Sequence, residues 1–143
     1  MVKIILVSHN GLGDSLLDCL RHVLGKVPSH LHSFSVLASD NPVEKEKELR
    51  TLIQHINTGA GVLILVDVYG ATPSNIAKRV CLPNHVEGVA GVNLPMLLRV
   101  VCCSGKSLAD LVERAQLGGK ECIVTLNSEM EACDVTTRCI DHQ

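Results

Sequence analysis

The fold can be worked out from ILVSHNGLGDSLLD, residues 5–18. The stretch begins with an unbroken apolar run, which is typical of a parallel strand covered on both faces. The run ends at His9, and Asn10, Gly11 and Gly13 then lead into leucines at helical spacing. A strand that passes through a glycine turn into a helix is the beginning of an α/β unit. It leaves a titratable imidazole at the end of a buried strand.

The same alternation continues along the chain. Runs rich in valine, isoleucine and leucine predict strands at 2–8, 31–37, 61–67, 86–92 and 121–126. Helical spacing and capping residues predict helices at 13–25, from Pro42 onward, at 73–81, 95–103 and 107–118, the last ending in a pair of glycines. This order predicts an α/β fold, a three-layer sandwich around a mostly parallel sheet.

Composition limits the classes of partner. The chain has 143 residues, the size of one ordinary domain, and a formal net charge of −2, which gives no reason to expect nucleic acid or an anionic membrane. No apolar run approaches the roughly 20 residues that a membrane span needs. The first residues, MVKIILVS, are too short for a signal peptide, so we expect a cytoplasmic protein. We expect one domain over residues 1–127 and a C-terminal tail over 128–143.

Metal and cofactor sites are not predicted. The series Cys122, Cys133, Cys139 and His142 matches no regular ligand spacing. His30 and His32 share strand spacing, but no third ligand lies near them in the sequence, so we expect ordinary surface histidines.

Two ionisable residues mark the expected site. In open parallel sheets the ligand crevice lies beyond the carboxyl ends of the strands, where strand order reverses. For a flavodoxin-like order that begins 2-1-3, the first and third strands flank that point. His9 ends the first predicted strand and Asp67 ends the third. After Asp67, Thr72 and Pro73 read as an N-cap and first helical residue, and such a helix start favours an anion in the same crevice.

An imidazole, a carboxylate and a helix N-terminus together suit covalent phosphoryl transfer through histidine. The neutral imidazole attacks phosphorus, the carboxylate fixes its tautomer, and backbone N–H groups hold the phosphoryl oxygens. Position alone leaves open that His9 and Asp67 are merely polar strand ends.

Two other kinds of site could be built from the same residues. A dinucleotide-binding loop would need a third glycine where Leu16 stands, and Asp14 would repel the pyrophosphate. A phosphate-accepting receiver domain would use Asp67, but it needs an acidic pair after the first strand to hold Mg²⁺. His9 and Asn10 occupy the place of that acidic pair. Both alternatives therefore fit the sequence less well than phosphoryl transfer through histidine.

Three blocks carry a family resemblance: VSHNG after the first strand, LVDVYGATPSNIA across the turn after the third, and VAGVNLPMLL after the fourth. In order and spacing they resemble the mannose-type enzyme IIA domain of the phosphoenolpyruvate-dependent sugar phosphotransferase system, over residues 1–126. The resemblance implies a phosphotransferase with a covalent phosphohistidine intermediate.

The resemblance implies specific residues and partners. The phosphorylated histidine falls on His9 and its supporting aspartate on Asp67. We expect the phosphoryl group to be held by Thr72, Asn10, Gly70 and Ser74. The donor is then the carrier protein HPr and the acceptor an enzyme IIB partner. The family fold also implies sheet order 2-1-3-4 and a homodimer that exchanges an antiparallel strand at residues 121–126.

Transport is not the only role open to such a domain. Domains of this type also occur where the membrane components are missing, and there the phosphorylation state of the histidine serves regulation. The donor subunit for dihydroxyacetone kinase is a third reading, but its motif is less like VDVYGATPSN.

Overall fold

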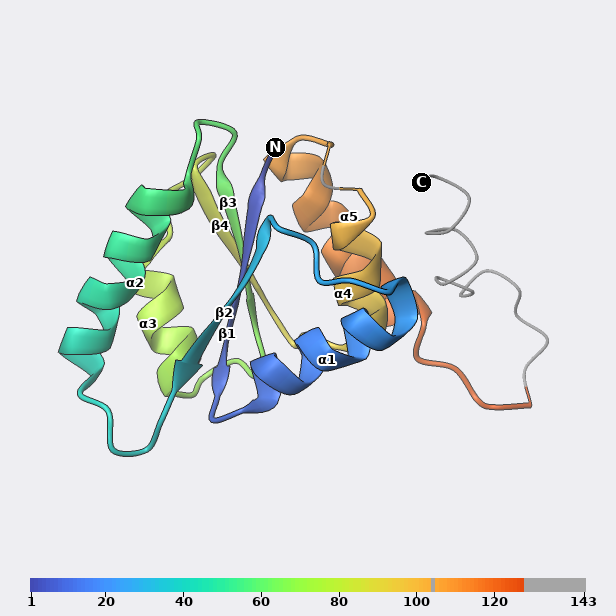
Figure 1. Cartoon of the computed structure of the whole chain (residues 1–143), viewed down its shortest axis with the longest axis horizontal. Helices are drawn as coiled ribbons and strands as arrows, with labels where there is room; N and C mark the ends of the chain where they lie inside the picture. Colours follow the sequence, from blue (N-terminus) through green and yellow to red (C-terminus); the bar gives the residue numbers. More distant parts are fainter. Residues whose placement is uncertain (104, 128–143) are drawn as a thin grey trace.

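Strands and helices alternate along the chain, as predicted (Figure 1). The structure, a computed structural model, describes residues 1–103 and 105–127. The strands are β1 (Lys3–His9), β2 (Leu31–Val36), β3 (Val62–Val66) and β4 (Val86–Ala90). The helices are α1 (Leu12–Leu24), α2 (Pro42–Ile56), α3 (Thr72–Val80), α4 (Leu94–Val101) and α5 (Leu108–Glu121).

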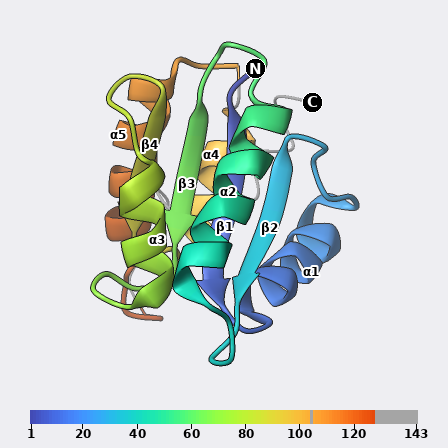
Figure 2. The ribbon, with the colours of Figure 1, turned by 90° about the vertical axis from the view of Figure 1, so that its left-hand side faces the viewer.

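The sheet has four strands in the order β2-β1-β3-β4, and all of its neighbouring pairs are parallel, which confirms the predicted order (Figure 2). In the β1–β3 register, Val7 lies opposite Val66. Asp67 directly follows Val66, the last residue of β3, and β1 continues from Val7 through Ser8 to His9. The register therefore brings the two predicted site residues to the same edge of the sheet.

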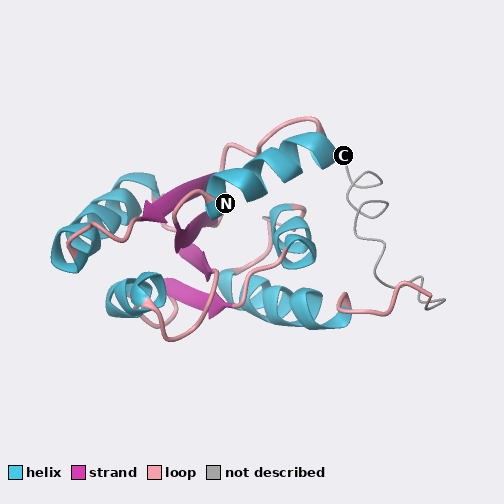
Figure 3. Ribbon diagram, turned by 90° about the horizontal axis from the view of Figure 1, so that it is seen from below, coloured by secondary structure: helices cyan, strands magenta, loops and turns pink. Residues whose placement is uncertain are grey.

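Helices cover both faces of the sheet, so the molecule has three layers (Figures 1 and 3). Ile4 and Leu6 belong to the apolar cluster under α1, α4 and α5. Ile5 and Val7 belong to the cluster under α2 and α3. All four side chains are at most 1% exposed, which is why β1 is apolar without alternation.

Gly118 and Gly119 do not end the last helix, contrary to the prediction, because α5 continues through them to Glu121. A Cβ atom added at Gly118 would lie 2.8 Å from Cδ of Arg99, and one at Gly119 would lie 2.9 Å from Cε of Met96. The glycines allow α5 to pack closely against α4, which is a different use from a helix stop.

The fifth strand predicted at 121–126 does not form within this chain. Glu121 is the last residue of α5, and no strand occurs in residues 122–127. Ile123 and Leu126 are 77% and 104% exposed, so most of their apolar surface is uncovered by the described residues. The tail at 128–143, with most of the metal-like series, lies outside the described residues.

His30 is buried, so its prediction as a surface residue is wrong. The residue is 7% exposed, and its Nε2 has no hydrogen-bond partner among the described residues. Burial, and then the charge of Lys3, lower the pKa of His30, although a hydrogen bond with the Val101 backbone opposes them. The neighbouring His32 is half-buried, and burial also lowers its pKa.

The stability of the protein should therefore fall in mild acid. The unfolded chain takes up a proton on His30 near the ordinary pKa of 6.5, whereas the folded chain takes it up only at lower pH. The stability that neutral His30 provides is complete above the ordinary value, and it is lost as the pH falls toward the folded pKa. Urea unfolding between about pH 7.5 and pH 5 measures this loss, and His30→Gln should reduce it.

His22 is the matched control because it is exposed on α1. His22→Gln should leave the pH dependence of unfolding as it is in the wild type. An equal pH dependence in wild type and His30→Gln would show that burial of His30 has no part in it.

Candidate functional site

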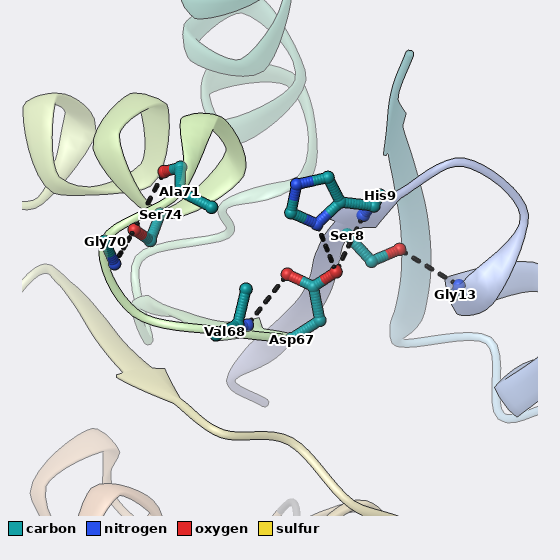
Figure 4. Close-up of polar contacts among 8 residues, drawn as sticks. All are labelled: Ser8, His9, Gly13, Asp67, Val68, Gly70, Ala71 and Ser74. Carbon is teal, nitrogen blue, oxygen red and sulfur yellow. Dashed lines mark hydrogen bonds and ion pairs between the residues drawn. The ribbon is translucent and has the colours of Figure 1, made fainter. Parts of the chain in front are cut away.

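One carboxylate oxygen holds His9 twice (Figure 4). Oδ2 of Asp67 accepts a hydrogen bond from the His9 backbone N–H at 2.9 Å and lies 2.7 Å from the ring Nδ1. The other oxygen, Oδ1, accepts from the Val68 N–H at 2.8 Å. Asp67 therefore fixes the end of β1, the direction of the imidazole and the start of its own loop.

These contacts also keep Asp67 ionised. Burial by itself raises the pKa of the carboxyl group, but the hydrogen bonds from the His9 backbone, the His9 ring and the Val68 N–H outweigh it. The net effect lowers the pKa of Asp67 below its ordinary value. At neutral pH the carboxylate is thus a full acceptor beside the imidazole.

The geometry determines which ring nitrogen of His9 is free to react. A carboxylate only accepts hydrogen bonds, so Nδ1 must carry the proton that it donates to Asp67. The lone pair of the neutral ring is then on Nε2. The His9 side chain is 45% exposed and that of Asp67 is 9% exposed, so the nucleophile is accessible while the supporting group is covered.

The chain leaves β1 through a strained residue. Asn10 has a φ of 49°, in the left-handed region that asparagine tolerates better than most residues. Its backbone N–H donates to the Val36 carbonyl at 3.0 Å, which extends the pairing of β1 with β2. That N–H is not free to hold a phosphoryl oxygen, and only the exposed side chain of Asn10 remains for the predicted role.

The start of α3 is the part of the site that offers free donors. The N-cap is Ala71, so the prediction that Thr72 caps this helix was one residue late. The first helical N–H to reach a carbonyl is that of Asn75, which donates to Ala71 at 3.0 Å. The N–H groups of Thr72 and Ser74 come before that bond, and Thr72 is exposed. An anion near this helix start would meet both N–H groups and the Thr72 hydroxyl.

The Ser74 hydroxyl is engaged within its own turn. Ser74 is 3% exposed. Its hydroxyl donates to the Ala71 carbonyl at 3.0 Å and accepts from the Gly70 N–H at 2.8 Å (Figure 4). Gly70 has a φ of 86°, which few residues other than glycine adopt. Ser74 and Gly70 thus hold the turn between Asp67 and α3, and the hydroxyl proton is already used.

If the site transfers a phosphoryl group through His9, as the sequence predicts, replacement of Ser74 by alanine should slow that transfer without abolishing it. The change removes both hydrogen bonds of the turn, so Asp67 and the α3 N–H groups are held less firmly. We expect a fall of about tenfold in the transfer rate at saturating donor, since small displacements of positioned groups are costly. Stopped-flow or quench kinetics with phosphorylated donor measure it.

Thr51 provides the control because its hydroxyl donates to the Lys47 carbonyl at 3.0 Å on α2, away from the site. Thr51→Ala loses a similar hydrogen bond and should keep the wild-type rate. Equal rates for Ser74→Ala and Thr51→Ala would contradict the positioning role of Ser74.

The role of Ser8 in the site was not predicted from the sequence. Ser8 is 1% exposed. Its hydroxyl accepts a hydrogen bond from the Gly13 N–H at 3.0 Å, which connects the start of α1 to β1 (Figure 4). A Cβ atom at Gly13 would lie 2.7 Å from Oγ of Ser33 and 2.9 Å from Oγ of Ser8. Gly13 thus allows a close approach of helix and sheet beneath His9. A serine inside an apolar strand next to a glycine turn was the available signal.

The arrangement suits nucleophilic chemistry on an anion. It combines an oriented imidazole, an ionised carboxylate and a helix start with free N–H groups. Among residues 1–103 and 105–127 no group of three histidine, cysteine or acidic side chains could bind a metal ion. In the same described ranges, no helix has both the length and the apolar character of a membrane span.

Comparisons with known proteins find relatives over most of the chain. A model of the family described as PTS system fructose IIA component (EIIA-man) matches residues 3–116. The PTS system mannose-specific EIIAB component of Escherichia coli (strain K12) is 27% identical over 131 residues, which are 90% of this chain and 40% of that protein. The protein of the same description from Shigella flexneri gives the same values. The chain thus spans 40% of the length of these curated relatives.

Solved structures share the fold. The mannose/sorbose specific IIA subunit from Enterococcus faecalis has a TM-score of 0.78 at 21% identity, and covers 90% of this chain and 97% of that one. The phosphotransferase system component EIIA from Streptococcus agalactiae has a TM-score of 0.74 at 24% identity, and covers 87% and 97%. Both identities are low, so these structures support the fold alone.

Proposed function

The chain belongs to the EIIA-man family of phosphotransferase system IIA components, and we propose that it is a cytoplasmic phosphocarrier that accepts a phosphoryl group on His9. Membership in this family implies phosphotransfer in general. The observation that carries the specific proposal is the distance of 2.7 Å between Nδ1 of His9 and Oδ2 of Asp67. It leaves Nε2 as an accessible nucleophile.

The proposed reaction has two half-reactions. In the first, the Nε2 lone pair of His9 attacks the phosphorus of a phosphorylated donor protein, and the bond from phosphorus to the donor breaks with its electron pair returning to the donor. Asp67 balances the positive charge that develops on the ring. In the second, a nucleophile of the acceptor attacks the same phosphorus, and the electron pair of the Nε2–P bond returns to His9.

The start of α3 is the proposed binding site for the phosphoryl oxygens. The N–H groups of Thr72 and Ser74 and the Thr72 hydroxyl are the donors free to bind them, with the Asn10 side chain on the opposite loop. Gly70 and the Ser74 hydroxyl contribute by holding the turn. This division keeps the predicted residues but separates those that would bind phosphate from those that position the binding groups.

The proposed partners are HPr as donor and an enzyme IIB protein as acceptor. The curated relatives support them through their printed description as mannose-specific EIIAB components, of which this chain matches 40%. Incubation with enzyme I, HPr and phosphoenolpyruvate, followed by peptide mapping, tests the donor. We expect one phosphoryl group on His9, and an unlabelled chain would refute the proposal.

Addition of purified enzyme IIB proteins to the labelled chain tests the acceptor. Loss of the label to one of them supports a place in sugar uptake. Stable label on His9 in the presence of each of them would instead favour a regulatory protein that reports phosphorylation state.

We also propose a homodimer formed by exchange of the segment after α5. Ile123, Val124 and Leu126 are exposed apolar side chains. β4 lies at the edge of the sheet, and beyond Val86, which pairs with Leu82, no other described strand pairs with its outer side. Addition of a strand there would cover both features. Sedimentation equilibrium should give twice the chain mass, and replacement of both Ile123 and Val124 by aspartate should give the monomer. A wild-type monomer at all concentrations would contradict the exchange.

A further inference from the structure

The turn that follows His9 contains a chemically labile amide. Asn10 is the one asparagine of the chain that is followed by glycine. An asparagine in this position loses its side-chain amide more readily than any other, because the glycine has no side chain to hinder attack by its backbone nitrogen. The amide at risk is the neutral group that the proposed function places near the phosphoryl oxygens.

No hydrogen bond holds the peptide unit between Asn10 and Gly11. Among the described residues, the Asn10 carbonyl accepts none, the Gly11 N–H donates none, and the Asn10 side chain has no polar partner. The chain is held on both sides of this unit, because the Asn10 N–H donates to Val36 and the Gly11 carbonyl accepts from Ser15, each at 3.0 Å. The unit itself is therefore free to turn its Gly11 nitrogen toward Cγ of Asn10.

Space and solvent also reach the turn. Asn10 and Gly11 are both exposed. A Cβ atom added at Gly11 would have no atom within 4 Å. The turn is thus open to the movement that attack requires and to the water that completes the reaction.

We propose that Asn10 is a deamidation site, and that its conversion to a carboxylate slows the acceptance of a phosphoryl group by His9. The Gly11 nitrogen attacks Cγ of Asn10 and forms the N–Cγ bond of a cyclic imide. The bond from Cγ to the side-chain nitrogen breaks, and ammonia leaves with the proton of the Gly11 N–H. Water then opens the imide at either carbonyl and gives aspartate or isoaspartate.

The effect on His9 rests on its proposed function. The new charge belongs to the residue next to His9, and the Cα atoms of neighbouring residues are about 3.8 Å apart. Exposed charges are screened only over a Debye length of about 8–10 Å, so the carboxylate repels the negatively charged group that a donor brings. The carboxylate also has no N–H to offer to a phosphoryl oxygen. Isoaspartate in addition lengthens the main chain by one carbon between β1 and α1.

Asn84 is the matched control within the same chain. It is exposed and has a φ of 66°, close to the 49° of Asn10. Its successor is His85, which has a side chain and whose N–H donates to the Leu82 carbonyl at 3.0 Å. The nitrogen that would attack Asn84 is thus both hindered and engaged, so Asn84 should keep its amide.

Incubation of the purified protein tests the site. Peptide masses and methylation by an isoaspartyl methyltransferase are followed in mildly alkaline buffer with a thiol reductant, since attack requires loss of the Gly11 N–H proton. The peptide with Asn10 should change from amide to acid, and the peptide with Asn84 should not. Gly11→Ala should prevent the change, and its fold should survive because Gly11 has a φ of −90°, which alanine adopts.

Initial rates of transfer from phosphorylated HPr test the effect on His9. Fresh Asn10→Asp should accept the phosphoryl group about tenfold more slowly than fresh Asn10→Gly, because a like charge opposes the approach of the donor. Both replacements remove the amide and tolerate a positive φ, so they differ in charge. Incubated wild type should lose rate in proportion to its deamidated fraction, while incubated Gly11→Ala keeps the rate that it had when fresh. Urea unfolding confirms that each variant is folded.

The outcomes separate the deamidation site from the function of His9. An intact Asn10 amide after incubation, or equal change at Asn10 and Asn84 or in wild type and Gly11→Ala, overturns the site. Equal rates for Asn10→Asp and Asn10→Gly overturn the effect of the charge, even if Asn10 deamidates. Absence of transfer to fresh wild type refutes the proposed function and the effect on His9, whereas the peptide masses still decide on the site.

Discussion

His9→Ala should accept no phosphoryl group from phosphorylated HPr, with the transfer rate reduced by at least about a thousandfold. The substitution removes the nucleophile, and the other exposed histidines have no carboxylate that fixes one tautomer among the described residues. The fold should survive, because the His9 side chain is 45% exposed at the end of its strand and contributes little to the core. Radiolabel transfer followed by gel separation measures the effect.

His22→Ala is the control for His9→Ala, since His22 is an exposed histidine on α1. It should be labelled at the wild-type rate. Undiminished labelling of His9→Ala would show that the phosphoryl group goes to another residue, and the assignment of His9 would be wrong.

Asp67→Asn should slow transfer in both directions by about a hundredfold to ten-thousandfold, the range expected when a histidine loses the carboxylate that fixes its tautomer. An amide can offer its NH₂ group to Nδ1, and the ring then carries its proton on Nε2, which is no longer a nucleophile. The amide also cannot balance the positive charge that the ring gains during transfer. Forward rates from phosphorylated HPr and reverse rates to unphosphorylated HPr measure the loss.

Asp14→Asn is the control for this variant, because Asp14 is an exposed carboxylate in the first turn of α1. It should transfer at the wild-type rate. The Asp67 carboxylate also accepts two backbone N–H groups, so the free energy of unfolding has to be measured in parallel. Wild-type rates for a folded Asp67→Asn in both directions would rule out the orienting role.

The pairing of His9 with Asp67 could be predicted from the sequence because it depends on topology. Carboxyl ends of adjacent parallel strands meet at one edge of a sheet, and the two buried strands were evident from their unbroken apolar runs. That adjacency was assumed from a flavodoxin-like order beginning 2-1-3, and the family resemblance supplied the full order 2-1-3-4. The register that aligns Val7 with Val66 came from the structure.

Features that depend on individual atoms could not be predicted. The Ser74 hydroxyl is used inside its own turn because Gly70 adopts a positive φ, and nothing in the residue types alone specifies that geometry. His30 is buried by elements distant in sequence, among them the end of α4. Gly118 and Gly119 looked like a helix end, since close packing against another helix cannot be distinguished from a stop in a single sequence.

The position of the phosphoryl group on the His9 ring is the most direct test of the site. Phosphorus and nitrogen NMR spectra of the phosphorylated, nitrogen-15-labelled protein distinguish the two ring nitrogens. Because Nδ1 is held by Asp67 at 2.7 Å, the phosphorus should be bonded to Nε2, with Nδ1 still carrying its proton. A phosphoryl group on Nδ1, or on any residue other than His9, would contradict the mechanism.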